Sequence, residues 1–407
     1  MLYITRTLIR RIPGAVIKMV PLPVPEVLSG IGATEEAGAF CIRNGFKKVL
    51  LVTDETLYGL GVHEKVEMSL QKNHVEFSVF REISSEPNLA IIDAGRKALE
   101  ESGADAIIAL GGGAVMDACK MIASGGRLKK RRSRALLRKF LFVKGKTLPM
   151  LSIPTTAGTG AEMTVGAVVT DDKGRKVSSV IVGLDVRGVI LDGGLTLKLP
   201  LHVTASCGID ALSHGLEGTV ASVRVADEDM EKSMQCVKLV LENLPVLLRE
   251  PQNEEARQNM CLAAHYGGHA INKQLAGYVH AFAHTIGAKY HIPHGEAIAL
   301  SLMPVMEIQK EKCMDRLAAL SRFTGFPDET EDDAAASERL LEALRELIGL
   351  CAFKNRISSI PKADYRSIAH AVAMDSINYS PPVVLTNGQI FAVLDRLNES
   401  FGTDCPA

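Results

Sequence analysis

Residues 106–120 read AIIALGGGAVMDACK: a short apolar run, three consecutive glycines and the start of a helical pattern. The apolar run is typical of a buried strand, and the glycines expose backbone amides at a strand-to-helix turn. Amides at the start of a helix, with the helix dipole behind them, can bind phosphate. The turn differs from G-x-G-x-x-G and from a Walker A loop. We predict a nucleotide site here; the alternative is a tight turn without a ligand.

The first half of the chain alternates short β-branched runs with helical patterns, which is typical of a parallel sheet. Strands are predicted at 49–52, 76–79, 106–110, 150–153 and 188–191, a hairpin at 167–180, and helices at 62–71 and 90–101. After Pro200 the patterns are helical, near 227–248, 254–271, 278–289, 331–350 and 363–374. We predict an α/β nucleotide-binding domain over residues 1–199 and an all-helical metal and substrate domain over 200–407.

Four residues of the second half could hold one metal ion. Asp210 and His214 lie four residues apart, which places them on one face of a helix, and His280 and His284 repeat this spacing. His294 follows a proline, so we expect it at a helix start, returned toward His280 by the turn. Three imidazoles and one carboxylate suit Fe(II), Zn or Ni better than calcium. The predicted ligands are Asp210, His214, His280 and His294.

Two potential ligands four residues apart also arise by chance in a chain with eleven histidines. We interpret the spacing of His265 and His269 in this way, and we expect His291 in a loop. The metal set is favoured because it occurs together with the glycine turn and with a third segment, PTTAGTG at 154–160. The hydroxyls and amides of that segment could bind a diphosphate or a ribose.

Taken in order, these motifs resemble the iron-containing (group III) alcohol dehydrogenase family, which has a dehydroquinate-synthase-like fold. The resemblance runs from about Pro23 to Phe391. It implies a metal-dependent NAD(H) alcohol dehydrogenase that interconverts an alcohol and an aldehyde or ketone by hydride transfer in the interdomain cleft. The resemblance implies that Asp210, His214, His280 and His294 correspond to the family's metal ligands. His284 then matches a histidine near the substrate and is a candidate for proton relay.

The resemblance also assigns the dinucleotide contacts to the first domain. They are Gly111, Gly112, Gly113, Asp117, Thr155, Thr156, Thr159, Thr164 and Lys176. Ala114 and Ala161 depart from the family pattern, because serine is usual at both positions. Each loses one hydroxyl, and a hydrogen bond contributes about 1 kcal/mol net, so we expect weaker cofactor binding without its loss.

Asp54 follows the first strand predicted above. A carboxylate at this position can accept hydrogen bonds from the adenosine ribose hydroxyls, and it repels a 2′-phosphate. The sequence therefore predicts NAD over NADP. The alternative is that Asp54 only caps the helix that follows.

Three other functions fit part of the pattern. Cyclising lyases of the dehydroquinate-synthase type act on a sugar phosphate with NAD and a metal, but they use a glutamate and two histidines as ligands. Metal-free reductases such as those acting on maleylacetate lose ligands that this chain has. A non-enzymatic binding protein is supported only by Ala114, Ala161 and Gly193.

The composition fits a cytoplasmic enzyme. Lysine and arginine total 46 against 47 acidic residues, and this balance predicts no nucleic-acid partner. Eight cysteines without a C-x-x-C motif indicate free thiols in a reducing compartment. The sequence contains no run of about eighteen apolar residues, the length that a membrane-spanning helix needs. We expect a small alcohol or carbonyl substrate and a homo-oligomer, such as a dimer.

Two basic segments can be explained without a specific function. Residues 127–139 are rich in lysine and arginine, which is typical of a solvated face, with contact to nucleic acid or an anionic surface as the alternative. The first twenty-five residues resemble a transit peptide slightly, but an ordinary N-terminal strand explains them.

Overall fold

The computed structural model describes residues 22–84, 87–125, 143–144, 147–171, 176–326, 331–354 and 357–402. The basic segment 127–139 lies outside the described residues. The chain divides into two compact units. The α/β unit contains Val20–Leu199 and Gln252–Gly268, and the helical unit contains Pro200–Pro251 and His269–Ala407. Helix α11 (Glu254–Gln274) is thus divided between the two units.

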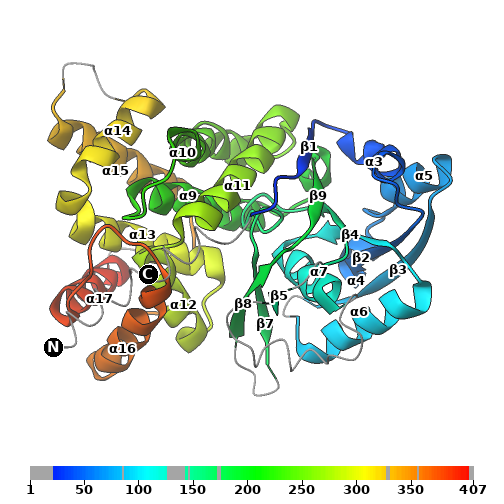
Figure 1. The fold of residues 1–407 in the computed structure, drawn as a ribbon. Helices are drawn as coiled ribbons and strands as arrows, with labels where there is room; N and C mark the ends of the chain where they lie inside the picture. The colour runs from blue at the N-terminus through cyan, green and yellow to red at the C-terminus, as the bar shows by residue number, and fades with distance from the viewer. Residues whose placement is uncertain are drawn as a thin grey trace. The chain divides into compact units, whose positions relative to one another are not determined.

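The α/β unit contains a six-stranded sheet in which every neighbouring pair of strands is parallel (Figure 1). The strand order is β1-β9-β6-β4-β2-β3. The strands are β1 (Glu26–Ser29), β2 (Lys48–Asp54), β3 (Glu76–Ile83), β4 (Ala106–Gly111), β6 (Met150–Pro154) and β9 (Val186–Leu191). The predicted parallel sheet is confirmed, although the short edge strand β1 was not among the predicted strands.

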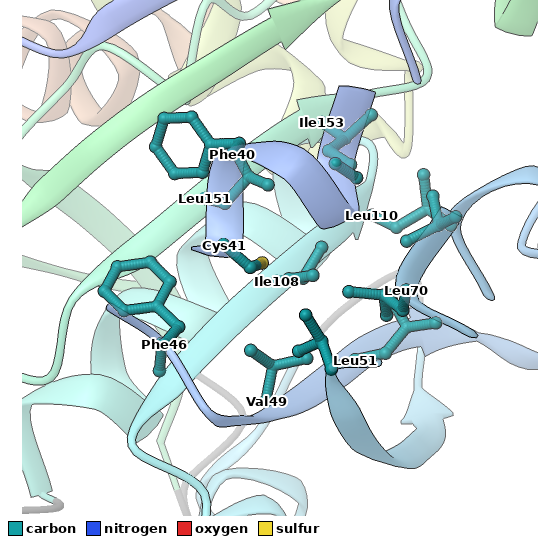
Figure 2. Packing of buried hydrophobic residues seen from close by; sticks show 14 of the residues in the cluster. Phe40, Cys41, Phe46, Val49, Leu51, Leu70, Ile108, Leu110, Leu151 and Ile153 are labelled. Carbon is teal, nitrogen blue, oxygen red and sulfur yellow. The ribbon is translucent and has the colours of Figure 1, made fainter. Parts of the chain in front are cut away.

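Helices cover both faces of this sheet. They are α3 (Ala37–Arg43), α4 (Glu55–Gly59), α5 (Glu64–Lys72), α6 (Leu89–Ser102) and α7 (Gly113–Gly125), with a 3-10 turn, η1 (Ala33–Glu36), before α3. Figure 2 shows Phe40 of α3 and Leu70 of α5 near alternate residues of the strands, such as Leu51 and Ile108. On the other face, α6 packs against α7 and β3, where Gly95 lies beside Phe80. Burial on both faces explains why the central strand β4, AIIALG, is apolar without interruption.

A smaller sheet joins β5 (Val143–Lys144), β8 (Lys176–Val182) and β7 (Gly166–Thr170), in that order. β7 and β8 are antiparallel, so the predicted hairpin is confirmed, while β5 pairs with β8 in parallel. A 3-10 turn, η2 (Gly193–Thr196), follows β9 before the first helix of the helical unit.

In the helical unit, the described residues form helices and short 3-10 turns without a strand. The helices are α9 (Leu201–Val220), α10 (Asp227–Arg249), the last residues of α11, α12 (Tyr278–Tyr290), α13 (His294–Gln309), α14 (Met314–Thr324), α15 (Asp333–Leu350), α16 (Tyr365–Asp375) and α17 (Asn387–Gly402). Short 3-10 turns are η3 (Lys310–Lys312), η4 (Lys362–Asp364) and η5 (Ser376–Asn378). Each predicted helical segment is present, and α13 begins at His294 as expected. Every residue of α9 from Gly208 to Val220 is buried, so α9 is the central helix of this unit.

The cysteines of the described residues are free thiols, most of them buried. Burial, followed by the charge of Asp105, raises the pKa of Cys41 to about 12, which keeps this thiol protonated and unreactive. Among the described helices, none is long and apolar enough to cross a membrane.

Leu51 tests the core beneath α3 and α5. This residue of β2 is fully buried, and Leu51→Ala should lower the free energy of unfolding by about 2–5 kcal/mol, because it removes apolar contacts and leaves a cavity. Urea unfolding followed by circular dichroism measures the change. Met68→Ala is the control, because this side chain of α5 is 58% exposed and its loss should change stability by under about 0.5 kcal/mol. Equal effects of the two substitutions would contradict the packing.

Candidate metal centre and nucleotide site

Helix α9 presents a carboxylate and an imidazole on successive turns. Asp210 and His214 are both buried, and His214 Nε2 lies 3.6 Å from Asp210 Oδ1. Their burial depends on close packing against α10, since a Cβ at Gly215 would lie 2.7 Å from the carbonyl oxygen of Ser233. The α9 face that carries these two residues is therefore held inside the helical unit.

The turn between α12 and α13 brings two more histidines to the same place. α12 ends at Tyr290, and the left-handed backbone of its C-cap His291 (φ 56°) reverses the chain; the Ile292 N–H donates to the Gly287 carbonyl. α13 then starts at His294, and the rings of His280 and His294 lie 5.7 Å apart. Gly295 allows α13 to approach α9, because a Cβ there would overlap Ser206.

Three imidazole nitrogens converge on one carboxylate oxygen. The Nε2 atoms of His294, His280 and His214 lie 3.2, 3.6 and 3.6 Å from Asp210 Oδ1. Ligands about 2.1 Å from a tetrahedral metal ion are separated by about 3.4 Å, so these spacings match such a site. The ligand atoms of Asp210, His280 and His294 lie within 4.8 Å of one another, and this is the only such group among the described residues; His214 lies outside it.

Two atoms of this group are buried without a hydrogen bond, namely Asp210 Oδ1 and His280 Nε2. Buried polar atoms are normally satisfied, so such a pair of atoms facing one point indicates a missing partner. A nitrogen and oxygen donor set of this kind suits a divalent transition metal. The residues therefore fit the metal that the sequence predicts.

The local charges favour a cation at this point. Burial alone would raise the pKa of Asp210, but His214 and His294 hold it well below its usual value. Burial opposes protonation of His280, yet Glu217 and then Asp210 outweigh this effect and raise its pKa to about 10. Burial lowers the pKa of His214 to about 4, so this ring stays neutral with a lone pair to donate.

Glu217 holds His280, and it was not among the predicted site residues. Its Oε2 lies 2.5 Å from His280 Nδ1, and its Oε1 accepts a hydrogen bond from Val279 N at 2.7 Å. Glu217 is buried on α9, seven residues after Asp210. That spacing returns it to the same helix face, which is the signal that could have identified it.

His284 lies beside the ligand group on an exposed position. Its side chain is 46% exposed, its ring stacks on His294 at 5.3 Å, and His294 is 43% exposed. His284 Nδ1 lies 3.2 Å from Asp375 Oδ2 and 3.1 Å from the hydroxyl of Tyr379, which also donates to Asp375. Asp375 and Tyr379, which were not predicted, thus fix this ring.

His265 and His269 do not meet at one centre. His265 Nδ1 lies 3.4 Å from Glu162 in the α/β unit, whereas His269 Nε2 lies 2.7 Å from Asp229 in the helical unit. Each therefore has its own carboxylate partner. This arrangement agrees with the interpretation that the spacing of the two residues arose by chance.

The predicted nucleotide residues follow the carboxyl ends of three adjacent strands. Asp54 ends β2, Gly111 ends β4, and Thr155 follows β6. The chain passes outward from β2 to β3 and then crosses to the other side of β2 to form β4. Ligands of open parallel sheets bind outside the carboxyl ends at such a switch point.

The glycine turn and the threonine segment lie against each other at this edge. The Thr155 N–H donates to the Gly111 carbonyl at 3.1 Å. A Cβ at Gly112 would lie 3.4 Å from the side chain of Thr156, and one at Gly113 would lie 3.1 Å from that of Thr159. The start of α7 thus has the side chains of Thr156 and Thr159 beside its glycines.

Asp117 and Thr164 are joined by a buried lysine that the sequence did not single out. Lys120 is 1% exposed, and its Nζ donates to Asp117 Oδ1 at 3.0 Å, to Thr164 Oγ1 at 2.9 Å and to the Gly166 carbonyl at 2.6 Å. The other oxygen of Asp117 accepts from Val168 N at 2.8 Å. Asp117 and Thr164, with Lys120, therefore hold α7 to β7 and to the segment before it.

Asp54 and Lys176 were also predicted to contact the dinucleotide, and the structure describes them to different extents. Asp54 Oδ1 accepts from Leu57 N at 2.8 Å, so it caps α4 as the alternative interpretation stated, and its Oδ2 is not part of that cap. Lys176 is the first residue of β8, and its side chain lies outside the described part.

Both halves of the chain match models of one protein family. Residues 24–185 match "Iron-containing alcohol dehydrogenase" and residues 204–397 match "Fe-containing alcohol dehydrogenase family, C-terminal". A probable alcohol dehydrogenase, EutG, from Escherichia coli is 30% identical over 90% of this chain and 91% of its own length. An NAD-dependent methanol dehydrogenase from Bacillus methanolicus is 30% identical over 79% of this chain and 84% of its own length.

Solved structures agree with these matches. A 1,3-propanediol oxidoreductase has a TM-score of 0.85 at 25% identity, covering 93% of this chain and 99% of its own. A sulfoacetaldehyde reductase from Bifidobacterium kashiwanohense, in complex with NAD+, has a TM-score of 0.84 at 25% identity, covering 95% and 99%.

Lys120→Met tests the buried network. The substitution leaves Asp117 Oδ1 without its cation, so the free energy of unfolding should fall by about 3 kcal/mol. Adding Asp117→Asn, which removes the uncompensated charge, should recover part of this loss in a double-mutant cycle. Urea unfolding gives both values. A change below about 0.5 kcal/mol for Lys120→Met would show that the amine is solvated and not part of the network.

Proposed function

Because the chain belongs to the iron-containing alcohol dehydrogenase family and is an NAD-dependent alcohol dehydrogenase, we propose that its helical unit holds the metal through one carboxylate and three imidazoles. The ligands are Asp210, His214, His280 and His294. The observation that supports this set most strongly is the convergence of three Nε2 atoms on Asp210 Oδ1, at 3.2 to 3.6 Å. The family matches favour the dehydrogenase over a cyclising lyase.

The residues around the ligands suit proton removal from an alcohol. A metal bound here acts as a Lewis acid that lowers the pKa of the substrate hydroxyl. His284 takes the proton at Nε2, because Asp375 and Tyr379 occupy the side of Nδ1. Its exposed side chain then passes the proton to solvent. The carbonyl product is reduced by the reverse sequence.

The α/β unit binds the cofactor in this proposal. Bound NAD would supply the hydride acceptor. The amides at the start of α7 and the hydroxyls of Thr156 and Thr159 bind the diphosphate. Asp54 Oδ2 accepts from the ribose hydroxyls while Oδ1 caps α4. Asp117 and Thr164 support these contacts through Lys120, and Lys176 reaches the cofactor as the resemblance implies.

The metal is Fe(II) in this proposal, with Zn and Ni as alternatives, because the family name indicates iron whereas the donor set suits all three. The substrate is a small alcohol or its carbonyl partner, since the similar proteins include enzymes named for methanol, 1,3-propanediol and sulfoacetaldehyde.

We also propose a cytoplasmic homo-oligomer, such as a dimer. The free thiols of the described residues support the location. The edge strand β1 supports an oligomer, because Val27 is 41% exposed and Val24, just before the strand, is 94% exposed.

Metal reconstitution tests the function. Protein stripped of metal should form no NADH, and Fe(II), Zn(II) or Ni(II) added without oxygen should restore NADH formation with a panel of short alcohols and diols. The metal and alcohol that give the highest rate identify the cofactor and the substrate class. If NAD binds but no metal supports oxidation, a lyase acting on sugar phosphates or a non-catalytic protein becomes the better proposal.

The matched variants are His280→Ala and Asp210→Ala. Each should abolish turnover and leave NAD binding unchanged, because the ligands belong to the helical unit and the glycine turn to the α/β unit. Loss of NAD binding in either variant would contradict this division of roles.

Asp54→Gly tests the cofactor preference. The ratio of kcat/KM with NADP to that with NAD should rise at least about tenfold, because a carboxylate that repels the 2′-phosphate is removed. Asp185→Gly is the control, since it removes the same charge just before the amino end of β9 and should leave the ratio unchanged. An unchanged ratio for Asp54→Gly would mean that Asp54 only caps α4.

A further inference from the structure

We infer that Glu217 is a positioning residue for the metal: it fixes the tautomer of His280 so that the Nε2 lone pair faces Asp210 Oδ1. The inference rests on the metal site proposed above and deepens it. Glu217 is not a ligand itself, because its two oxygens are occupied by His280 Nδ1 and Val279 N.

The tautomer follows from the hydrogen bonds. A carboxylate only accepts, so the proton between Glu217 Oε2 and His280 must reside on Nδ1 when the ring is neutral. Nε2 then carries a lone pair, and this atom is buried without a hydrogen bond, 3.6 Å from Asp210 Oδ1. Histidine ligands generally need such a partner on the second nitrogen.

Glu217 also fixes the position of α12. The first amides of a helix lack partners inside it, and Gly277, the N-cap of α12, has no side chain to supply one. Glu217 Oε1 accepts from one of these amides, Val279 N, and its charge suits a helix N-terminus. The same carboxylate therefore sets both the start of α12 and the orientation of a ligand on it.

Gly277 is the sequence feature that allows this contact. A Cβ at position 277 would lie 2.5 Å from Glu217 Oε1, too close for the carboxylate to keep its place. Its backbone (φ −132°) is one that alanine also adopts, so the requirement for glycine comes from the carboxylate and not from the turn. Glu217 and Gly277, sixty residues apart, are thus both needed for the carboxylate to contact the start of α12.

His214 differs from His280 in this respect. Its Nδ1 is buried without a hydrogen-bond partner among the described residues, so no side chain selects its tautomer. Its Nε2 is also outside the tight ligand group. His280 is therefore the imidazole on which Glu217 can act, and metal affinity should depend on Glu217.

Glu217→Gln separates the two roles of the residue. The amide oxygen can still accept from Val279 N, which preserves the start of α12. The amide nitrogen then donates to His280 Nδ1, which forces the proton onto Nε2 and blocks metal binding by that atom. With the amide reversed, its nitrogen faces the Val279 N–H, donor against donor. Neither orientation both accepts from Val279 N and leaves a lone pair on His280 Nε2.

The measurement is the metal dissociation constant of the full chain. Stripped protein is titrated without oxygen with Co(II), followed by its visible absorption, and with Zn(II) against a competing chelator. Glu217→Gln should raise both dissociation constants roughly 10- to 100-fold. NADH binding should not change. Thr219→Val is the control, because the hydroxyl of this buried α9 residue donates within its own helix, to the Gly215 carbonyl. The dissociation constants of this variant should equal those of the unsubstituted protein.

Gly277→Ala provides a second test if Glu217→Gln fails to fold. It displaces the carboxylate without changing a hydrogen-bonding group, and it should also weaken Co(II) binding. Unchanged metal affinity in either folded variant, with lower thermal stability, would overturn the inference and leave Glu217 as a helix cap. If the unsubstituted protein binds neither metal, the proposed function itself fails, and that result is distinct from a failure confined to the variants.

Discussion

The helical unit depends on one buried carboxylate oxygen that faces three imidazoles. Asp210 Oδ1 lies deep in the unit, and burial of an ionised carboxylate is unfavourable unless cationic or hydrogen-bonding partners compensate for it. Here the partners come from three helices, α9, α12 and α13, so the arrangement requires each helix to hold its place. A divalent ion held by these residues would satisfy the carboxylate and would also order the helices around it.

That requirement explains local features that would otherwise be unrelated. α9 is buried along most of its length and packs closely on α10 at Gly215. α13 approaches α9 at Gly295. His291 adopts a left-handed backbone, uncommon for a residue with a side chain, and thereby returns the chain to the proposed metal site. Each feature restricts the local backbone and thereby helps to position one of the proposed ligands.

Sequence patterns predicted what depends on short-range spacing. The strands around the glycine turn and the helical placement of Asp210 and His214 follow from periodicity, and the start of α13 follows from Pro293. Contacts between distant segments were missed. Glu217 acts on a residue 63 positions later, and Lys120 acts on Thr164, 44 positions later. The resemblance assigned Asp117 and Thr164 to the cofactor, but no pattern indicated that a buried lysine joins them.

The proposed role of Asp54 in coenzyme choice ties that choice to the stability of a helix. One oxygen of its carboxylate starts α4, so a lineage that moved toward NADP would also alter the fold locally. Replacement of a capping residue by alanine costs about 1 kcal/mol, whereas serine, threonine and asparagine retain most of the cap without a negative charge. The accessible evolutionary routes to a different coenzyme therefore pass through these small polar residues, and a hydrophobic residue at this position would need compensation elsewhere.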